Sequence, residues 1–329
     1  MTTLAYALFA ATYLDKVDAP DLKRHVTYLA SDELGGRGTP SPGLDKAADY
    51  IADEFKKVGV LPGNGDSYFQ VTEWTGRTDK GAKVRNVIGL IRGSDPELAK
   101  TYVVVSAHYD HLGTRPDAPG DDKIYNGAND DASGVSGMIE IAEALQTAKP
   151  KRSVVFIGWY GEEHGMVGSR YYVSKPVFPL KDTVANINLE QIGRTDDTEG
   201  ARVSAISMTG FEFSSIGKTF GKIGAEMSVP VTGHPTNSGR YFFASDNVSF
   251  ARAGIPAHTL CTAFQFPDYH QLKDTADKLD YSNMEKIVRM AAAGVLDIAN
   301  NAKAPEWDRS QKAVEKYVEA SDKLKAGGK

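Results

Sequence analysis

The sequence predicts one α/β domain, residues 1–329, with helices flanking a central β-sheet that is mostly parallel but mixed. Three short runs of β-branched and apolar residues, 101–107, 153–159 and 184–189, are too short for helices and are typical of strands buried on both faces. The amphipathic stretch 135–145 lies between the first two runs. Strands and helices therefore alternate, as they do in α/β proteins.

The alternation continues from about Asn86 to Leu296 without a linker, a repeat or a low-complexity segment, so the length does not require a second domain. A hydrophobic content of 41% can build a large core, and no run reaches the ~18 apolar residues of a membrane span. A net charge of −5 with no basic cluster argues against nucleic-acid binding. The single cysteine, Cys261, cannot form an intramolecular disulfide, and the oligomeric state stays open.

Helices are predicted at 22–29 and 46–58, and the glycine-rich segment 31–40 between them is either a connector or the wall of a cleft. Residues 305–329 are polar and predict a C-terminal helix with a frayed tail. Within residues 1–20, the short apolar run 4–11 is either the remnant of a secretory signal or the start of the first helix.

Residues that can bind metal follow the predicted strands. His108 comes directly after the first run, Glu162 and Glu163 follow the second, and Glu190 ends the third. The carboxyl ends of strands in an open α/β sheet face one crevice, where ligands bind. We therefore expect these four side chains to lie close together.

Three further acidic residues and one histidine belong to the same pattern. Asp110 lies two residues after His108, where its carboxylate could accept the second imidazole N–H of a metal-bound histidine. Asp130 and Asp131 lie in a polar loop before the helical stretch, where a helix N-cap would need only one aspartate. His270 lies in a loop after the apolar run 255–261. Each residue alone has an ordinary structural interpretation, but their convergence predicts a metal site.

The ordered set of motifs resembles the zinc aminopeptidases of the M28 peptidase family. The matching stretches span most of the chain and are His108–Asp110, Gly127–Gly134, Gly161–Gly165, Asn188–Gly193 and Tyr269–His270. The resemblance implies the phosphorylase/hydrolase-like fold of zinc exopeptidases, a peptide substrate and two Zn²⁺ ions. It also implies that Asp130 bridges the two ions, with His108 and Glu190 as ligands of one ion and Glu163 and His270 as ligands of the other. By the same resemblance, Glu162 is the general base and the Asp130–Asp131 peptide is cis.

The chemistry supports these roles. Two adjacent divalent ions can activate a water and stabilise a developing oxyanion, and Glu162, next to a ligand but not one itself, can move the proton. Three carboxylates and a hydroxide would balance four positive charges. Glu190 departs from the family, which most often has Asp there, so Mn²⁺ or Co²⁺ could replace zinc at that position.

Other residues and reactions stay open. Tyr241 or Tyr269 could donate a hydrogen bond to the oxyanion. The histidines that lack a second ligand at a diagnostic spacing are interpreted as surface or core residues: His25, His111, His164, His234 and His258.

The favoured activity is removal of N-terminal residues from peptides by a periplasmic or secreted enzyme. The alternatives are a carboxypeptidase, a one-zinc glutaminyl-cyclase-like acyltransferase, and a non-catalytic peptide-binding module.

Overall fold

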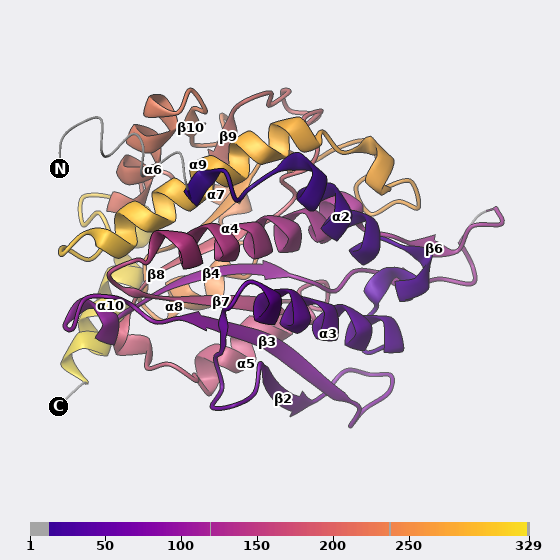
Figure 1. Ribbon diagram of the computed structural model, residues 1–329, viewed down its shortest axis with the longest axis horizontal. Coiled ribbons are helices and arrows are strands. Elements are labelled where there is room, and N and C mark those ends of the chain that lie inside the picture. The colour runs from indigo at the N-terminus through magenta and orange to yellow at the C-terminus, as the bar shows by residue number, and fades with distance from the viewer. Residues whose placement is uncertain (1–12, 119, 237, 328–329) are drawn as a thin grey trace.

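The computed structural model describes residues 13–118, 120–236 and 238–327, so the predicted signal remnant in residues 1–11 lies outside the described part. The centre is a nine-stranded sheet in the order β1-β3-β7-β4-β8-β11-β9-β10, with β2 paired to β3 (Figure 1). Its strands are β1 (Leu61–Pro62), β2 (Phe69–Glu73), β3 (Lys83–Ile91), β4 (Tyr102–His108), β7 (Ser153–Trp159), β8 (Thr183–Leu189), β9 (Ile206–Met208), β10 (Val231–Thr232) and β11 (Ala257–Cys261). The short strands β5 (Gly113–Thr114) and β6 (Ile124–Tyr125) form a second sheet.

The predicted α/β class and mixed sheet are confirmed, but parallel pairing is limited to part of the sheet. Strands β7, β4, β8 and β11 run parallel side by side, as do β9 and β10. The edge strands β1 and β2 pair antiparallel with β3, β3 pairs antiparallel with β7, and β9 pairs antiparallel with β11. The four central strands therefore send their carboxyl ends to one edge.

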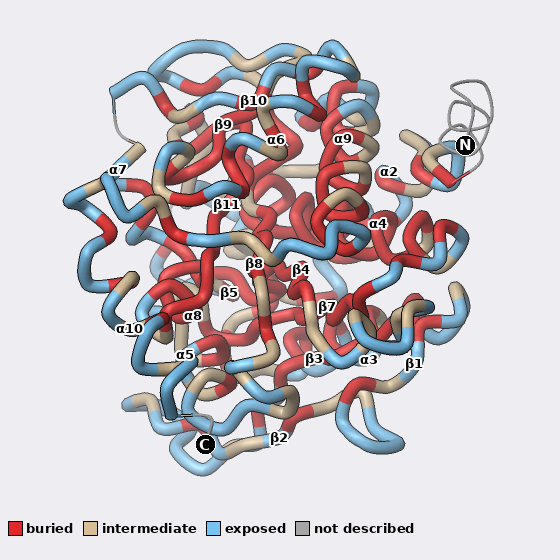
Figure 2. Tube along the Cα trace, turned by 90° about the vertical axis from the view of Figure 1, so that its left-hand side faces the viewer, coloured by how far each residue is buried: buried red, intermediate tan, exposed pale blue. Residues whose placement is uncertain are grey.

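Helices cover both faces of the sheet (Figure 1). One hydrophobic cluster joins the sheet to α2 (Ala19–Leu29), α3 (Pro42–Lys57), α4 (Gly134–Ala148), α6 (Ser215–Glu226) and α9 (Tyr281–Asn300). A second cluster joins the other face to α5 (Val167–Ser174), α8 (Asn247–Arg252) and α10 (Glu315–Ala326), and the short helix α7 (Ser238–Tyr241) precedes α8. Buried segments concentrate in the strands and in the helix faces that cover them (Figure 2).

The central strand β4 shows why the strand sequences read as continuous apolar runs. Val103 and Val105 pack in the first cluster, while Val104 between them packs in the second. Successive side chains of a strand point to opposite faces, and here both faces are covered.

The helix boundaries differ from the predictions where capping residues were overlooked. Helix α3 begins at Pro42, four residues before the predicted start, because the Ser41 side chain accepts a hydrogen bond from Leu44 N (3.0 Å). Of the segment 305–329, predicted as a C-terminal helix with a frayed tail, residues 315–326 form α10, and Trp307 before it is buried in the second cluster. Within the described residues, no helix combines the length and apolar character needed to cross a membrane.

His258 in β11 is a core histidine and gives the fold a pH dependence of its own. Its ring lies 2.7 Å from the Thr209 carbonyl oxygen and 2.6 Å from the Ser214 hydroxyl, and burial lowers its pKa to about 4. His258 becomes protonated near pH 6.5 in the unfolded chain but only near pH 4 in the folded protein. Its contribution to the free energy of unfolding is therefore fully present above pH 6.5 and is lost as the pH falls towards 4. The loss amounts to roughly 3 kcal/mol.

We expect His258→Gln to flatten this part of the pH profile, as measured by urea unfolding at several pH values between 4 and 7. The exposed His164 provides the control, because His164→Gln should leave the profile unchanged. An equally steep profile in both variants would contradict the assignment.

Candidate metal centre

The carboxyl ends of the central strands bring the predicted ligands to one place. His108 is the last residue of β4, Glu163 follows β7, and Asp130 lies in the irregular turn η3 (Ala128–Ser133) that leads into α4. Asp130 Oδ1 lies 3.2 Å from His108 Nε2, whereas Asp130 Oδ2 lies 3.0 Å from Nε2 of His270, which reaches the site from the loop after β11. The two oxygens of one buried carboxylate thus face two different imidazoles.

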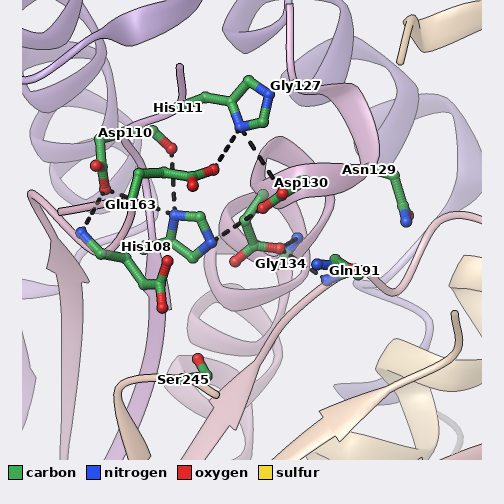
Figure 3. A network of polar contacts seen from close by, with 12 residues as sticks. His108, Asp110, His111, Gly127, Asn129, Asp130, Gly134, Glu163, Gln191 and Ser245 are labelled. Atoms are coloured by element: carbon green, nitrogen blue, oxygen red, sulfur yellow. Dashed lines mark hydrogen bonds and ion pairs between the residues drawn. The ribbon is translucent and has the colours of Figure 1, made fainter. Parts of the chain in front are cut away.

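Glu163 lies on the His270 side of Asp130. Its Oε2 atom is 3.3 Å from His270 Nε2, and its Oε1 atom is 2.9 Å from Nδ1 of His111 (Figure 3). His111, which the sequence analysis interpreted as a surface or core residue, is buried and lies in this cluster. Its position three residues after His108, in the segment that follows β4, was the one sequence signal, and it identifies no partner.

Glu190 directly follows β8 and interacts electrostatically with His108 and Asp130. Burial raises its pKa to about 8; the positive charge of His108 opposes this rise, and the negative charges of Asp130 and Asp246 add to it. Its Oε2 atom is buried without a hydrogen-bond partner among the described residues. Glu190 therefore belongs to the same electrostatic cluster.

Glu162 is positioned through its backbone. Its N–H donates to Asp110 Oδ1 at 3.0 Å, and Asp110 Oδ2 accepts the Thr39 hydroxyl at 3.2 Å. Burial holds the pKa of Glu162 well above its usual range, and the charges of Glu190 and Asp246 raise it further. Nearby cations would reverse this effect and restore the ionised form.

Asp110 supports His108 differently from the prediction. The His108 Nδ1 atom lies 3.2 Å from the backbone carbonyl oxygen of Asp110, and 3.6 Å from its carboxylate, which is too long for a hydrogen bond. The carbonyl therefore orients the imidazole, and the carboxylate holds the backbone of Glu162.

The chain around Asp130 is fixed by a network of side-chain to backbone hydrogen bonds. Asp131 Oδ1 accepts the N–H groups of Gly134 (3.1 Å) and Gln191 (2.9 Å), which joins η3 to the segment after β8. The Asp274 carboxylate accepts the N–H groups of Asn129 and Asp130 at 2.9–3.1 Å. The Asp130–Asp131 peptide is cis, as the resemblance implied.

The loop that carries His270 is held by an ion-pair network. Arg194 binds Asp196 (2.6 Å) and Asp268 (2.8 Å), and Lys278 also binds Asp268 (2.7 Å). Arg194 lies in the segment after β8, so this network fixes the His270 loop relative to the strand that delivers Glu190.

The two candidate tyrosines are placed differently. The ring of Tyr269 stacks on His270 with centroids 4.0 Å apart, and burial together with the charges of Asp130 and Glu190 raises its pKa. The hydroxyl of Tyr241 donates to Glu199 at 2.6 Å, and its ring stacks on Phe264. The structure thus brings Tyr269 into the carboxylate cluster, whereas the Tyr241 hydroxyl is engaged elsewhere.

Arg37 is a buried cation that the sequence analysis did not identify. It lies at the end of η1 (Asp32–Arg37), within the glycine-rich segment, and its guanidinium donates to the carbonyl oxygens of Tyr109 (2.8 Å), Asn126 (2.7 Å), Gly127 (2.9 Å) and Leu29. Burial lowers its pKa to about 10, against the opposing effect of nearby carboxylates. Arg37 joins the loops that carry His108 and Asp130, so its segment is more than a connector.

We expect Arg37→Met to lower the free energy of unfolding by about 3–5 kcal/mol, because it leaves buried carbonyls and carboxylates without their cation. Arg309→Met is the control. Arg309 pairs with Asp322 on the surface, where solvent screens the pair, so its loss should change stability little. Urea unfolding of both variants measures the difference, and equal losses would contradict the role of Arg37.

The donor atoms suit divalent cations. The cluster combines carboxylate oxygens with imidazole nitrogens, and several of them are buried without a hydrogen-bond partner among the described residues: His108 Nε2, His111 Nδ1, Glu163 Oε1 and Glu190 Oε2. Buried polar atoms are normally paired, so this group of unpaired atoms fits a site for metal ions. A buried carboxylate–histidine cluster at the carboxyl edge of an α/β sheet defines a candidate metal-dependent hydrolase.

Comparisons with known proteins agree with this class. Residues 86–295 match the model of peptidase family M28, and the chain belongs to that family. A protein described as a probable zinc metalloprotease, from Pyrenophora teres f. teres, is 30% identical over 209 residues, which make up 57% of this chain and 40% of that protein. Aminopeptidase YwaD of Bacillus subtilis is 25% identical over 268 residues, 77% of this chain and 54% of that protein.

The solved structures confirm the fold. The aminopeptidase LapA of Legionella pneumophila superposes with a TM-score of 0.67 at 19% identity, covering 89% of this chain and 75% of that chain. The chain spans only about half, or less, of the length of the two sequence relatives.

Proposed function

We propose that the protein is a zinc-dependent aminopeptidase that removes N-terminal residues from peptides. The observation that carries the proposal is Asp130, whose two carboxylate oxygens each lie within 3.2 Å of a different imidazole nitrogen. This arrangement supports a bridging ligand between two cation positions. The names of the relatives support zinc and aminopeptidase activity.

In this proposal His108 and Glu190 complete one position, and Glu163 and His270 complete the other. When bound, the two ions would lower the pKa of a water between them and polarise the scissile carbonyl. Glu162 would accept the proton of the attacking water and donate it to the leaving amine. Tyr269, stacked on His270, is the better placed of the two tyrosines to donate to the developing oxyanion.

Product analysis by mass spectrometry tests the proposal. A mixed peptide set is treated with the native protein and with the chelator-treated protein, before and after zinc is restored. We expect stepwise loss of N-terminal residues that stops on chelation and returns with zinc. C-terminal trimming would instead identify a carboxypeptidase, loss of ammonia or water without cleavage a cyclase, and metal binding without any reaction a binding module.

A further inference from the structure

We propose that His111 is itself a metal ligand, which joins His270 at the cation position formed by Asp130 and Glu163. The residues that match the family motifs include one histidine for each position, so His111 would be an additional ligand of this chain. The inference rests on the two-metal proposal above.

The donor atoms of His111, Asp130 and Glu163 lie within 4.8 Å of one another, close enough to bind one ion. His111 Nδ1 lies 2.9 Å from Glu163 Oε1 and 3.8 Å from Asp130 Oδ2. Although the first distance is short, neither His111 Nδ1 nor Glu163 Oε1 has a hydrogen-bond partner among the described residues. Ligands bound at about 2.0–2.2 Å around a tetrahedral ion lie roughly 3.3–3.6 Å apart. His108 Nε2 likewise has no hydrogen-bond partner among the described residues and lies 3.2 Å from Asp130 Oδ1.

The fold provides a fixed place for the His111 ring. The ring is fully buried and packs against Gly127, where an added Cβ would lie 2.5 Å from the imidazole carbons (Figure 3). Gly127 also has a φ of +59°, which favours glycine. The ring also lies edge-on to that of His270, with ring centroids 5.7 Å apart. The backbone N–H of His111 donates to the backbone carbonyl oxygen of Arg37 at 3.2 Å. The buried Arg37 segment therefore also positions this residue.

The additional imidazole makes the two cation positions unequal. One position would have two histidines and two carboxylates, whereas the other would have His108, Asp130 and Glu190. Imidazole suits zinc, and carboxylate-rich sites also accept Mn²⁺. The position next to His111 should therefore bind zinc more tightly and fill first, and exchange for Mn²⁺ or Co²⁺ should occur at the position of Glu190.

Proton NMR of the cobalt-loaded protein tests this inference without measuring activity. Each imidazole bound to Co²⁺ gives one strongly shifted, exchangeable N–H signal, so we expect three such signals, from His108, His111 and His270. His111→Ala should remove one signal and raise the zinc dissociation constant of the tighter position more than about 100-fold, beyond the 10–100-fold effect of residues that only support a ligand. His164→Ala is the matched control, because His164 is exposed and directly follows Glu163.

Two shifted signals in the native protein would overturn the role of His111, and so would a smaller loss of affinity in His111→Ala. If His111→Ala does not fold, the signal count of the native protein decides. Failure of the proposed function is distinguishable, because a native protein that binds no metal would reject both proposals. Two bound ions with two signals would reject only this one.

Discussion

Glu162→Gln should lower kcat by roughly 10²–10⁴-fold while leaving about two metal ions bound. Glutamine keeps the size of the side chain but cannot accept a proton from the attacking water. The backbone N–H of Glu162 would still donate to Asp110, so the loop should keep its position. Because the lost group is the base, the acidic limb of the kcat/KM profile should also disappear. Steady-state kinetics with metal analysis of the same samples measures both effects.

The control for this variant is Glu226→Gln, at an exposed glutamate in α6 that pairs with Lys222. Its kinetics should match those of the native protein. If Glu162→Gln retains more than a tenth of the native kcat, another group is the base. If it loses its metal ions, Glu162 is a ligand and the assigned roles are wrong.

Asp130→Asn should abolish binding of the metal pair. Asparagine keeps the shape of the side chain but removes the negative charge and one of the two acceptor oxygens that face His108 and His270. Zinc at about 1,000 times its dissociation constant should stabilise the native protein by about 4 kcal/mol, and this gain should be largely lost in the variant. Unfolding with and without zinc measures the gain, and we expect activity to fall with it.

Asp53→Asn, at an exposed position of α3, controls for the loss of a negative charge and should keep the full zinc effect. An Asp130→Asn protein that binds two zinc ions as tightly as the native protein would show that this carboxylate does not bridge them.

The candidate metal centre was largely predictable because several of its proposed ligands lie where strands end. The β-branched runs before His108, Glu163 and Glu190 indicated buried strands, and parallel strands deliver their ends to one edge. The strands β4, β7 and β8 follow the predicted runs closely. The edge strands β1 and β2 and the short strand β9, which pair antiparallel with their neighbours, were not predicted, because their pairing depends on tertiary contacts rather than on a local pattern.

Two residues were missed because their roles depend on distant parts of the chain. His111 is recognisable only when Glu163 and Gly127 are seen beside it, and neither is near it in sequence. Arg37 lies among glycines typical of a turn, yet its partners include carbonyl oxygens of residues 109, 126 and 127. Such contacts leave no periodic signal in the sequence.

We propose that one carboxylate, that of Asp130, joins two cations into a catalytic pair. Native mass spectrometry of the metal-free protein during zinc titration, with peptide hydrolysis measured at each point, tests it most directly. We expect species with one and then two zinc ions, and full activity only when the two-zinc species predominates. Binding that stops at one zinc ion in a fully active protein would contradict it.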